Sequence, residues 1–175
     1  MAMVKGFIII TVLVLFLVMS PWIQSTRVLS ESGISVEGDF DVEEPPEAYG
    51  ASVVGSYFTL FPNSALGAPD QRGAVLYQHG WITLQLERPV PDCQQVNVWL
   101  VRIGWKFAKF SIYISDRGKK WTLIARDQIS SPYYTEYAFS GDYGDVSYVK
   151  VSYDSSMSWI NFILLDAVKA EGGER

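Results

Sequence analysis

The hydrophobic and polar positions of residues 81–170 alternate in short runs, which is the pattern of half-buried β-strands. In 81–87, 107–115 and 146–154, aliphatic or aromatic residues alternate with more polar ones, and turn sequences such as DRGKK lie between the runs. Further runs lie at 95–103, 121–126, 135–139 and 161–170, with an early run near 51–60. About eight strands at this spacing are typical of an all-β sandwich or barrel. We therefore predict about eight antiparallel strands in two packed layers, with no helix in 48–170.

The N-terminus has a different pattern. Lys5 precedes an uninterrupted apolar run over 7–19, followed by Ser20 and Pro21. A basic start, an apolar segment and then small or polar residues is the order of a secretory signal. Extended through Ile23, the run reaches the lower limit for a membrane-spanning helix. We predict that 1–27 is a signal peptide or membrane anchor helix and that the rest of the chain is extracytoplasmic, either anchored or secreted.

Charge separates a spacer from the folded part. Residues 28–47 carry seven acidic side chains and no basic one, which predicts a disordered acidic linker. The predicted domain, 48–171, then holds 11 acidic and 11 basic residues, and 172–175 form a tail. A neutral domain without a basic stripe argues against nucleic acid as a partner.

Few residues suggest catalysis. Cys93 is the single cysteine, so no internal disulfide forms, and His79 is the single histidine, which excludes multi-histidine metal sites. Asp142 and Asp145 form a carboxylate pair in a glycine-rich turn, which leaves a hydrolase as a minor alternative. We predict that the protein is not an enzyme.

Four segments resemble a known family. The segment FSIYISDRGKKWTLIA (110–125), the late strand YVKVSY (148–153), the stretch 65–87 that begins ALGAPD, and the closing NFILLDAVKA (161–170) are similar to discoidin-like (coagulation-factor C-type, galactose-binding-like) domains in their prokaryotic variant. The resemblance implies a jelly-roll β-sandwich, usually non-catalytic. Its loops at one end would bind glycans, lipid head groups or protein surfaces. The chain lacks the terminal cysteine pair, and at 162–166 it has FILLD where the variant has Phe-Asp-Leu-Asp.

The family commonly carries a structural calcium, and the loop 63–73 is the candidate site. Asn63 and Asp70 would supply oxygens, with Asp166 or Glu171 reaching over from the last strand. The alternative is a rigid turn in which Pro69 fixes the backbone and Asp70 binds nearby amides.

Aromatic residues expected in loops are the candidates for ligand binding, because sugars stack on exposed rings while polar groups bind their hydroxyls. The alternative is that these rings cap the ends of the core. The candidate rings are Tyr57, Phe61, His79, Trp105, Tyr133 and Trp159, and Arg72 is a candidate donor to sugar hydroxyls or to an acidic sugar.

The sequence therefore predicts an extracytoplasmic binding or adhesion module for cell-surface or extracellular glycans, attached to the membrane through its N-terminal segment or secreted. The alternative is a structural subunit that packs against another protein of the cell envelope. The oligomeric state stays open.

Overall fold

The computed structural model describes residues 46–104, 107–156 and 161–173. The predicted signal or anchor segment (1–27) and nearly all of the acidic linker (28–47) lie outside these residues. Within the described part, no helix has the length and apolar character needed to cross a membrane. The described strands are β1 (Glu47–Leu60), β2 (Ala74–Val90), β3 (Cys93–Ile103), β4 (Ala108–Ser115), β5 (Thr122–Ile129), β6 (Thr135–Ser140), β7 (Val146–Ser156) and β8 (Phe162–Gly172).

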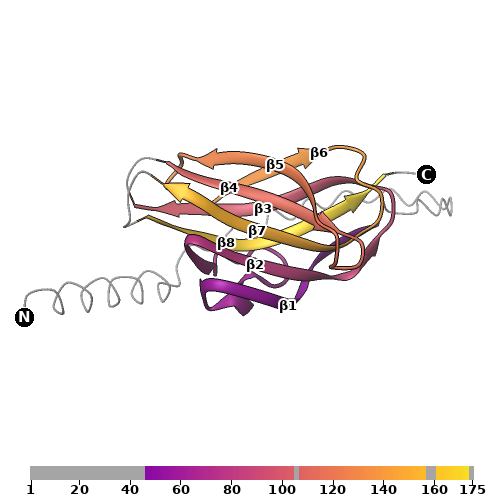
Figure 1. Ribbon diagram of the computed structural model, residues 1–175, viewed down its shortest axis with the longest axis horizontal. Helices are drawn as coiled ribbons and strands as arrows, with labels where there is room; N and C mark the ends of the chain where they lie inside the picture. Colours follow the sequence, from indigo (N-terminus) through magenta and orange to yellow (C-terminus); the bar gives the residue numbers. More distant parts are fainter. Residues whose placement is uncertain (1–45, 105–106, 157–160, 174–175) are drawn as a thin grey trace, which may run out of the picture. The chain divides into compact units, whose positions relative to one another are not determined.

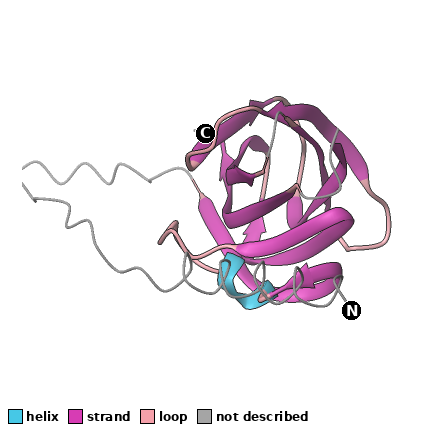
Figure 2. Cartoon of the chain, turned by 90° about the vertical axis from the view of Figure 1, so that its left-hand side faces the viewer, coloured by secondary structure: helices cyan, strands magenta, loops and turns pink. Residues whose placement is uncertain are grey.

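The strands form one antiparallel sheet in the order β5-β4-β7-β2-β1-β8-β3-β6, and this sheet folds into two layers (Figures 1 and 2). One layer contains β5, β4, β7 and most of β2 and β1, and the other contains β8, β3 and β6. Ring contacts join the layers: Phe110 of β4 lies 5.2 Å from Tyr137 and 6.2 Å from Phe139 of β6, between ring centroids. The prediction of an all-β fold with two packed layers is confirmed.

The alternation predicted from the sequence determines which side chains fill the core. In β4, Phe110, Ile112 and Ile114 are buried, and in β7 Val149 and Val151 are buried. Their neighbours on each strand point to the outer face, because successive side chains of a strand alternate between the two faces. Cys93 is buried as well, and burial raises the pKa of its thiol. The cysteine is therefore a small core residue.

β1 and β2 form a two-stranded ribbon that bends back on itself. Residues 74–77 of β2 pair antiparallel with β8, whereas 81–90 pair antiparallel with β7. Because β7 and β8 run in opposite directions (Figure 1), the two parts of β2 also run in opposite directions. β1 follows the same bend, with 50–57 paired to 81–86 and 59–60 paired to 75–76. Sequence reasoning began this strand at Trp81 and missed its first part, 74–80.

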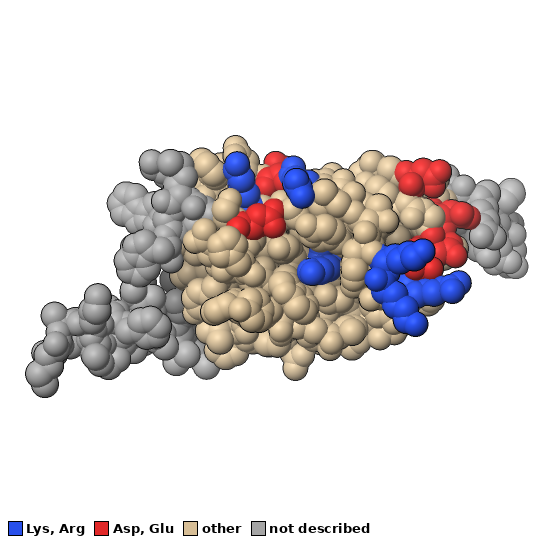
Figure 3. All heavy atoms as spheres, viewed as in Figure 1, with Lys and Arg blue, Asp and Glu red and all other residues tan. Residues whose placement is uncertain are grey.

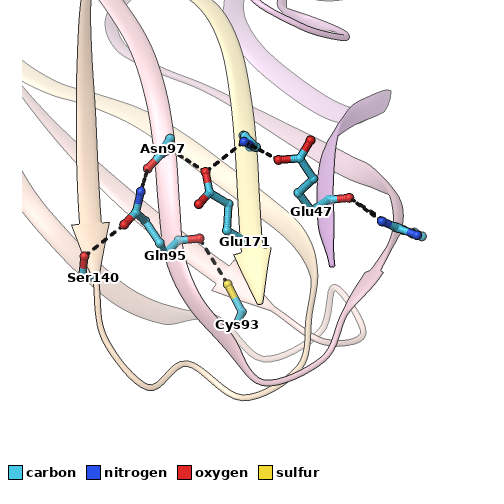
Figure 4. A network of polar contacts seen from close by, with 8 residues as sticks. Glu47, Cys93, Gln95, Asn97, Ser140 and Glu171 are labelled. Atoms are coloured by element: carbon cyan, nitrogen blue, oxygen red, sulfur yellow. Dashed lines mark hydrogen bonds and ion pairs between the residues drawn. The ribbon is translucent and has the colours of Figure 1, made fainter. Parts of the chain in front are cut away.

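A polar network lies across β6, β3, β8 and β1 (Figure 4). Asn97 donates to the Glu171 carboxylate at 2.9 Å and accepts from Gln95 at 2.9 Å. Lys169 pairs with Glu171 at 3.0 Å and with Glu47 at 2.5 Å. Glu47 therefore belongs to β1 and not to the linker predicted to end there.

One further segment completes the domain. Residues Pro62–Ala65 form a one-turn 3-10 helix, η1, which sequence reasoning did not predict. Pro62 at its start has a backbone angle suited to the first position of a helix. The helix lies at the lower edge of the strands in Figure 2, just after the bent part of β1.

Candidate functional site

The bend of the β1–β2 ribbon exposes a group of aromatic side chains. Tyr57 and Phe58 come from β1, and Tyr77 and His79 come from β2; we call these four residues the bend cluster. Tyr57 and Phe58 are 54% and 56% exposed, and their rings meet edge to face with centroids 4.5 Å apart. Such an arrangement holds two large rings at the surface in a fixed orientation.

Unusual backbone geometry creates this bend. Phe58 and His79 have φ angles of 46° and 66°, in the left-handed region that costs energy for residues other than glycine. Position 80 of β2 requires glycine, because a Cβ there would lie 2.6 Å from the carbonyl oxygen of Phe58 on β1. The hydroxyl of Thr59 donates to the carbonyl oxygens of Tyr57 and Trp81, both at 3.0 Å. These contacts fix the backbone that carries the exposed rings.

The second layer supports the bend cluster from one side. The ring of Tyr77 lies 6.1 Å from that of Phe162, the first residue of β8, which is 8% exposed. Tyr77 is 39% exposed, so one part of its ring contacts the domain and another part faces solvent. The cluster therefore combines rigid support with an accessible apolar surface, which is what stacking on a sugar requires.

The other predicted ligand residues that the structure describes are not part of the bend cluster. Phe61 is 50% exposed and precedes η1, and Tyr133 is 77% exposed before β6. Arg72 is exposed and pairs with Asp70 at 3.8 Å. Trp105 and Trp159 lie outside the described residues, so their role stays a prediction.

Sequence reasoning selected Tyr57 and His79 as ligand residues. It considered Phe58 and Tyr77 only as further aromatic residues of the same segments, and the bend brings their backbone close to Tyr57 at Gly80. The signal for Tyr77 was the interrupted alternation at 77–80, where YQHG ends the apolar run 74–76. Such an interruption with glycine indicates a bulge or a bend.

The loop 66–73 is anchored to β8 by one buried carboxylate. Asp166, which is 2% exposed, accepts hydrogen bonds from the backbone N–H of Gln71 at 3.1 Å and of Asp70 at 3.3 Å. The Asp70 carboxylate accepts from the N–H of Arg72 at 2.9 Å, and the Tyr134 hydroxyl donates to the Gln71 carbonyl at 3.1 Å. Hydrogen bonds to three successive residues thus hold the loop as a turn.

Burial raises the pKa of Asp166 to about 6, although the two backbone hydrogen bonds oppose the increase and the nearby Asp70 carboxylate adds to it. Burial also raises the pKa of Tyr134, with Asp166 and Asp70 as secondary causes. The Tyr134 hydroxyl therefore keeps its proton and remains a donor to the loop.

The described side chains do not fit the cage of oxygens that calcium requires. Of the four residues predicted as ligands, only Asp70 and Asp166 come together, and their oxygens accept backbone amides. Glu171 lies five residues beyond Asp166 on β8, about 16 Å from it, and belongs to the polar network with Lys169. Asn63 lies in η1. No group of three or more metal-binding side chains occurs in the described part of the chain. Calcium stays a prediction of the resemblance, whereas the hydrogen bonds of the described residues are those of a rigid turn.

An open pocket of about 350 Å³ lies where β4 leads into β5. Its lining includes Tyr143 and the charged residues Asp116, Lys120 and Asp145. Of the pair considered for a hydrolase, Asp145 lines this pocket, whereas Asp142 is not among its lining residues. The pocket therefore does not bring the two carboxylates into one cleft.

Comparisons with known proteins show which known structures share this fold. No protein-family model matches the sequence, and no curated protein matches it. Among solved structures, truncated AlyQ with CBM32 and alginate lyase domains is 13% identical with a TM-score of 0.53; the match covers 75% of this chain and 35% of that one.

Two further structures cover whole modules. The CBM32 of AlyQ in complex with 4,5-unsaturated mannuronic acid is 13% identical with a TM-score of 0.51, over 70% of this chain and 96% of that one. CBM32-1 from a family 31 glycoside hydrolase of Clostridium perfringens is 12% identical with a TM-score of 0.50, over 71% and 93%. At this identity the similarity shows the fold alone. That fold is the discoidin-like, galactose-binding-like β-sandwich that the sequence motifs resemble.

Proposed function

We propose that this protein is a glycan-binding module built on a jelly-roll β-sandwich, and that the bend cluster is its ligand surface. The observation that carries the proposal is the group of rings that the bend holds at the surface, with Tyr57 and Phe58 more than half exposed. Large rings that are exposed together, unlike single exposed rings, are typical of a binding surface.

The chemistry of the cluster suits a sugar. A pyranose ring stacks its apolar face on Tyr57 or Phe58, while the Tyr57 and Tyr77 hydroxyls and the His79 imidazole exchange hydrogen bonds with sugar hydroxyls. The fixed backbone lowers the entropy lost on binding, because the rings are already oriented. The similarity to carbohydrate-binding modules supports this proposal without identifying the sugar.

The cellular placement is also a proposal. The apolar run over 7–19 and the acidic linker that follows it suit a module held outside the cytoplasm, or secreted, and free to reach extracellular glycans. The module needs no catalytic residue for this role.

The proposal is tested with a glycan array and with isothermal titration of the glycans that bind. Tyr57→Ala and Phe58→Ala should each weaken binding at least tenfold, about 1.4 kcal/mol, as expected for loss of a stacking ring. Leu123→Ala is the matched control, because Leu123 is an exposed apolar residue on β5, outside the bend cluster. Wild-type affinity in both ring variants, with the fold intact, would refute this location.

A protein partner is the second candidate. Val54, Leu60 and Phe61, near the bend cluster along the chain, are 44–56% exposed, and wide apolar surfaces are typical of protein interfaces. If the array gives no signal, cross-linking and mass spectrometry on intact cells would identify a neighbour. Leu60→Asp should abolish such a cross-linked product.

A further inference from the structure

A lysine lies between two aromatic rings on the outer face of the layer that contains β2, β7 and β4. The ammonium nitrogen of Lys150 lies 4.6 Å from the Trp81 ring centroid and 5.8 Å from that of Tyr113. Lys150 is directly opposite Tyr113 on β4 and Thr83 on β2. The two rings are thus on either side of the cation, on neighbouring strands of one face.

The same face leads into the bend cluster. Trp81 is the cross-strand partner of Tyr57, and directly opposite residues have Cβ atoms about 5 Å apart. Gly55 of β1 leaves room for the indole, because a Cβ there would lie 3.3 Å from the Trp81 ring. Tyr57, Trp81, Lys150 and Tyr113 therefore form a row across four neighbouring strands, which we call the outer-face row.

Lys150 has no ion pair with any described residue. The ion pairs formed within the described part of the chain involve Arg72, Arg117 and Lys169 instead. Figure 3, which views the molecule as in Figure 1, shows that charged side chains are sparse over the middle of this view and gather in groups toward its ends. The ammonium is held by the faces of two rings, so it can pair with an anion from outside without displacing a protein carboxylate.

An acceptor lies further along β7. The Asp154 carboxylate accepts from the Ser111 hydroxyl at 2.5 Å and from the Ser152 hydroxyl at 3.1 Å. Four residues along a strand separate Asp154 from Lys150 by about 13 Å. Its remaining lone pairs can accept sugar hydroxyls, so this end of the face suits the neutral part of a chain and Lys150 suits an acidic part.

From this arrangement we infer that the ligand is an acidic glycan, and that a uronic acid carboxylate pairs with the Lys150 ammonium while neighbouring sugar rings stack on the outer-face row. The inference rests on the proposed glycan-binding function and adds to it the chemical class of the sugar. A small anion such as phosphate would use the cation alone and gain nothing from Trp81 and Tyr113.

The test compares a uronic acid oligosaccharide with the same oligosaccharide after its carboxyl groups are reduced to alcohols. Isothermal titration of the full chain should show tighter binding of the acidic form, with a preference that shrinks as salt increases. Lys150→Met keeps the apolar stem and should weaken binding of the acidic form roughly tenfold, the order expected for loss of one charge-assisted hydrogen bond. The loss should be smaller for the reduced form, because an alcohol accepts only a weaker hydrogen bond from the ammonium than a carboxylate does.

Lys109→Met is the matched control. Lys109 is another lysine beside a ring, 5.9 Å from the Phe107 centroid, and it has no place in the outer-face row. If Lys109→Met reproduces the loss, the effect is one of net charge and the inference is refuted.

The salt dependence of the wild-type preference is a second measurement that does not depend on how well the variant folds. Wild-type binding of the neutral form without a preference for the acidic form would overturn this inference and leave glycan binding standing. Binding of neither form, nor of any glycan on the array, would overturn both.

Discussion

Replacing Asp166 with asparagine should change how the stability of the domain depends on pH. Burial raises the pKa of Asp166 from 3.8 to about 6, because the carboxylate lies under the 66–73 loop and close to Asp70. A carboxyl group whose pKa is higher in the folded state binds its proton more tightly there than in the unfolded chain. Its contribution to stability is therefore present at low pH and is lost as pH rises from about 4 to about 6.

The size of this effect follows from the two pKa values. A difference of about 2 between the folded and unfolded states corresponds to at most about 3 kcal/mol. An asparagine at this position does not titrate, and its side-chain oxygen can still accept one of the two amides that Asp166 binds. Between pH 4 and pH 7, titration of Asp166 should therefore cost the wild type up to this amount of stability. Asp166→Asn should not show this loss.

Urea unfolding monitored by tryptophan fluorescence at pH 4, 5, 6 and 7 measures the free energy of unfolding directly. The wild-type value minus the variant value should fall from pH 4 to about pH 6 and level off toward pH 7. Asp142→Asn is a control for the loss of one exposed negative charge. A difference between wild type and Asp166→Asn that is the same at every pH would refute the reasoning, because it would show that Asp166 titrates alike in both states.

Three further results are expected. Thermal melting with calcium and with chelator should give the same midpoint, because the oxygens of Asp70 and Asp166 already accept backbone amides; a shift of several degrees would show that calcium binds the folded form. Gly80→Ala should lower stability by about 1–3 kcal/mol and weaken glycan binding, because its methyl group would meet the Phe58 carbonyl; an unchanged melting temperature and affinity would contradict the role given to the bend. Phe110→Ala should cost about 3–5 kcal/mol in urea unfolding, because this fully buried ring joins the two layers, and a loss below about 1 kcal/mol would show that the layers pack in another way.

The sequence alone predicted most of the strands, because each had one apolar face. In β4 and β7 the alternation of Phe110, Ile112, Val149 and Val151 with polar residues identified both the strand and its buried side. The first part of β2 was missed, since Tyr77 to Gly80 break the alternation where the ribbon bends. A local pattern does not specify a bend that depends on pairing with two different strands.

The candidate site was predicted less completely for the same reason. The contact of Asp166 with the loop was anticipated as one of two options, because the last strand carries only a few acidic residues. The row of Trp81, Lys150 and Tyr113 was not anticipated, since it depends on the register between segments that are far apart along the chain. Periodicity shows which face a residue takes, whereas register decides which side chains meet across strands.

Nuclear magnetic resonance during a titration with a glycan selected from the array would show whether the bend cluster is the ligand surface. Backbone amide shifts should change at 57–59 and 77–81, around the bend cluster, while the β6–β3 edge of the other layer should be unaffected. Shift changes confined to another surface, or no binding of any glycan, would contradict the proposal.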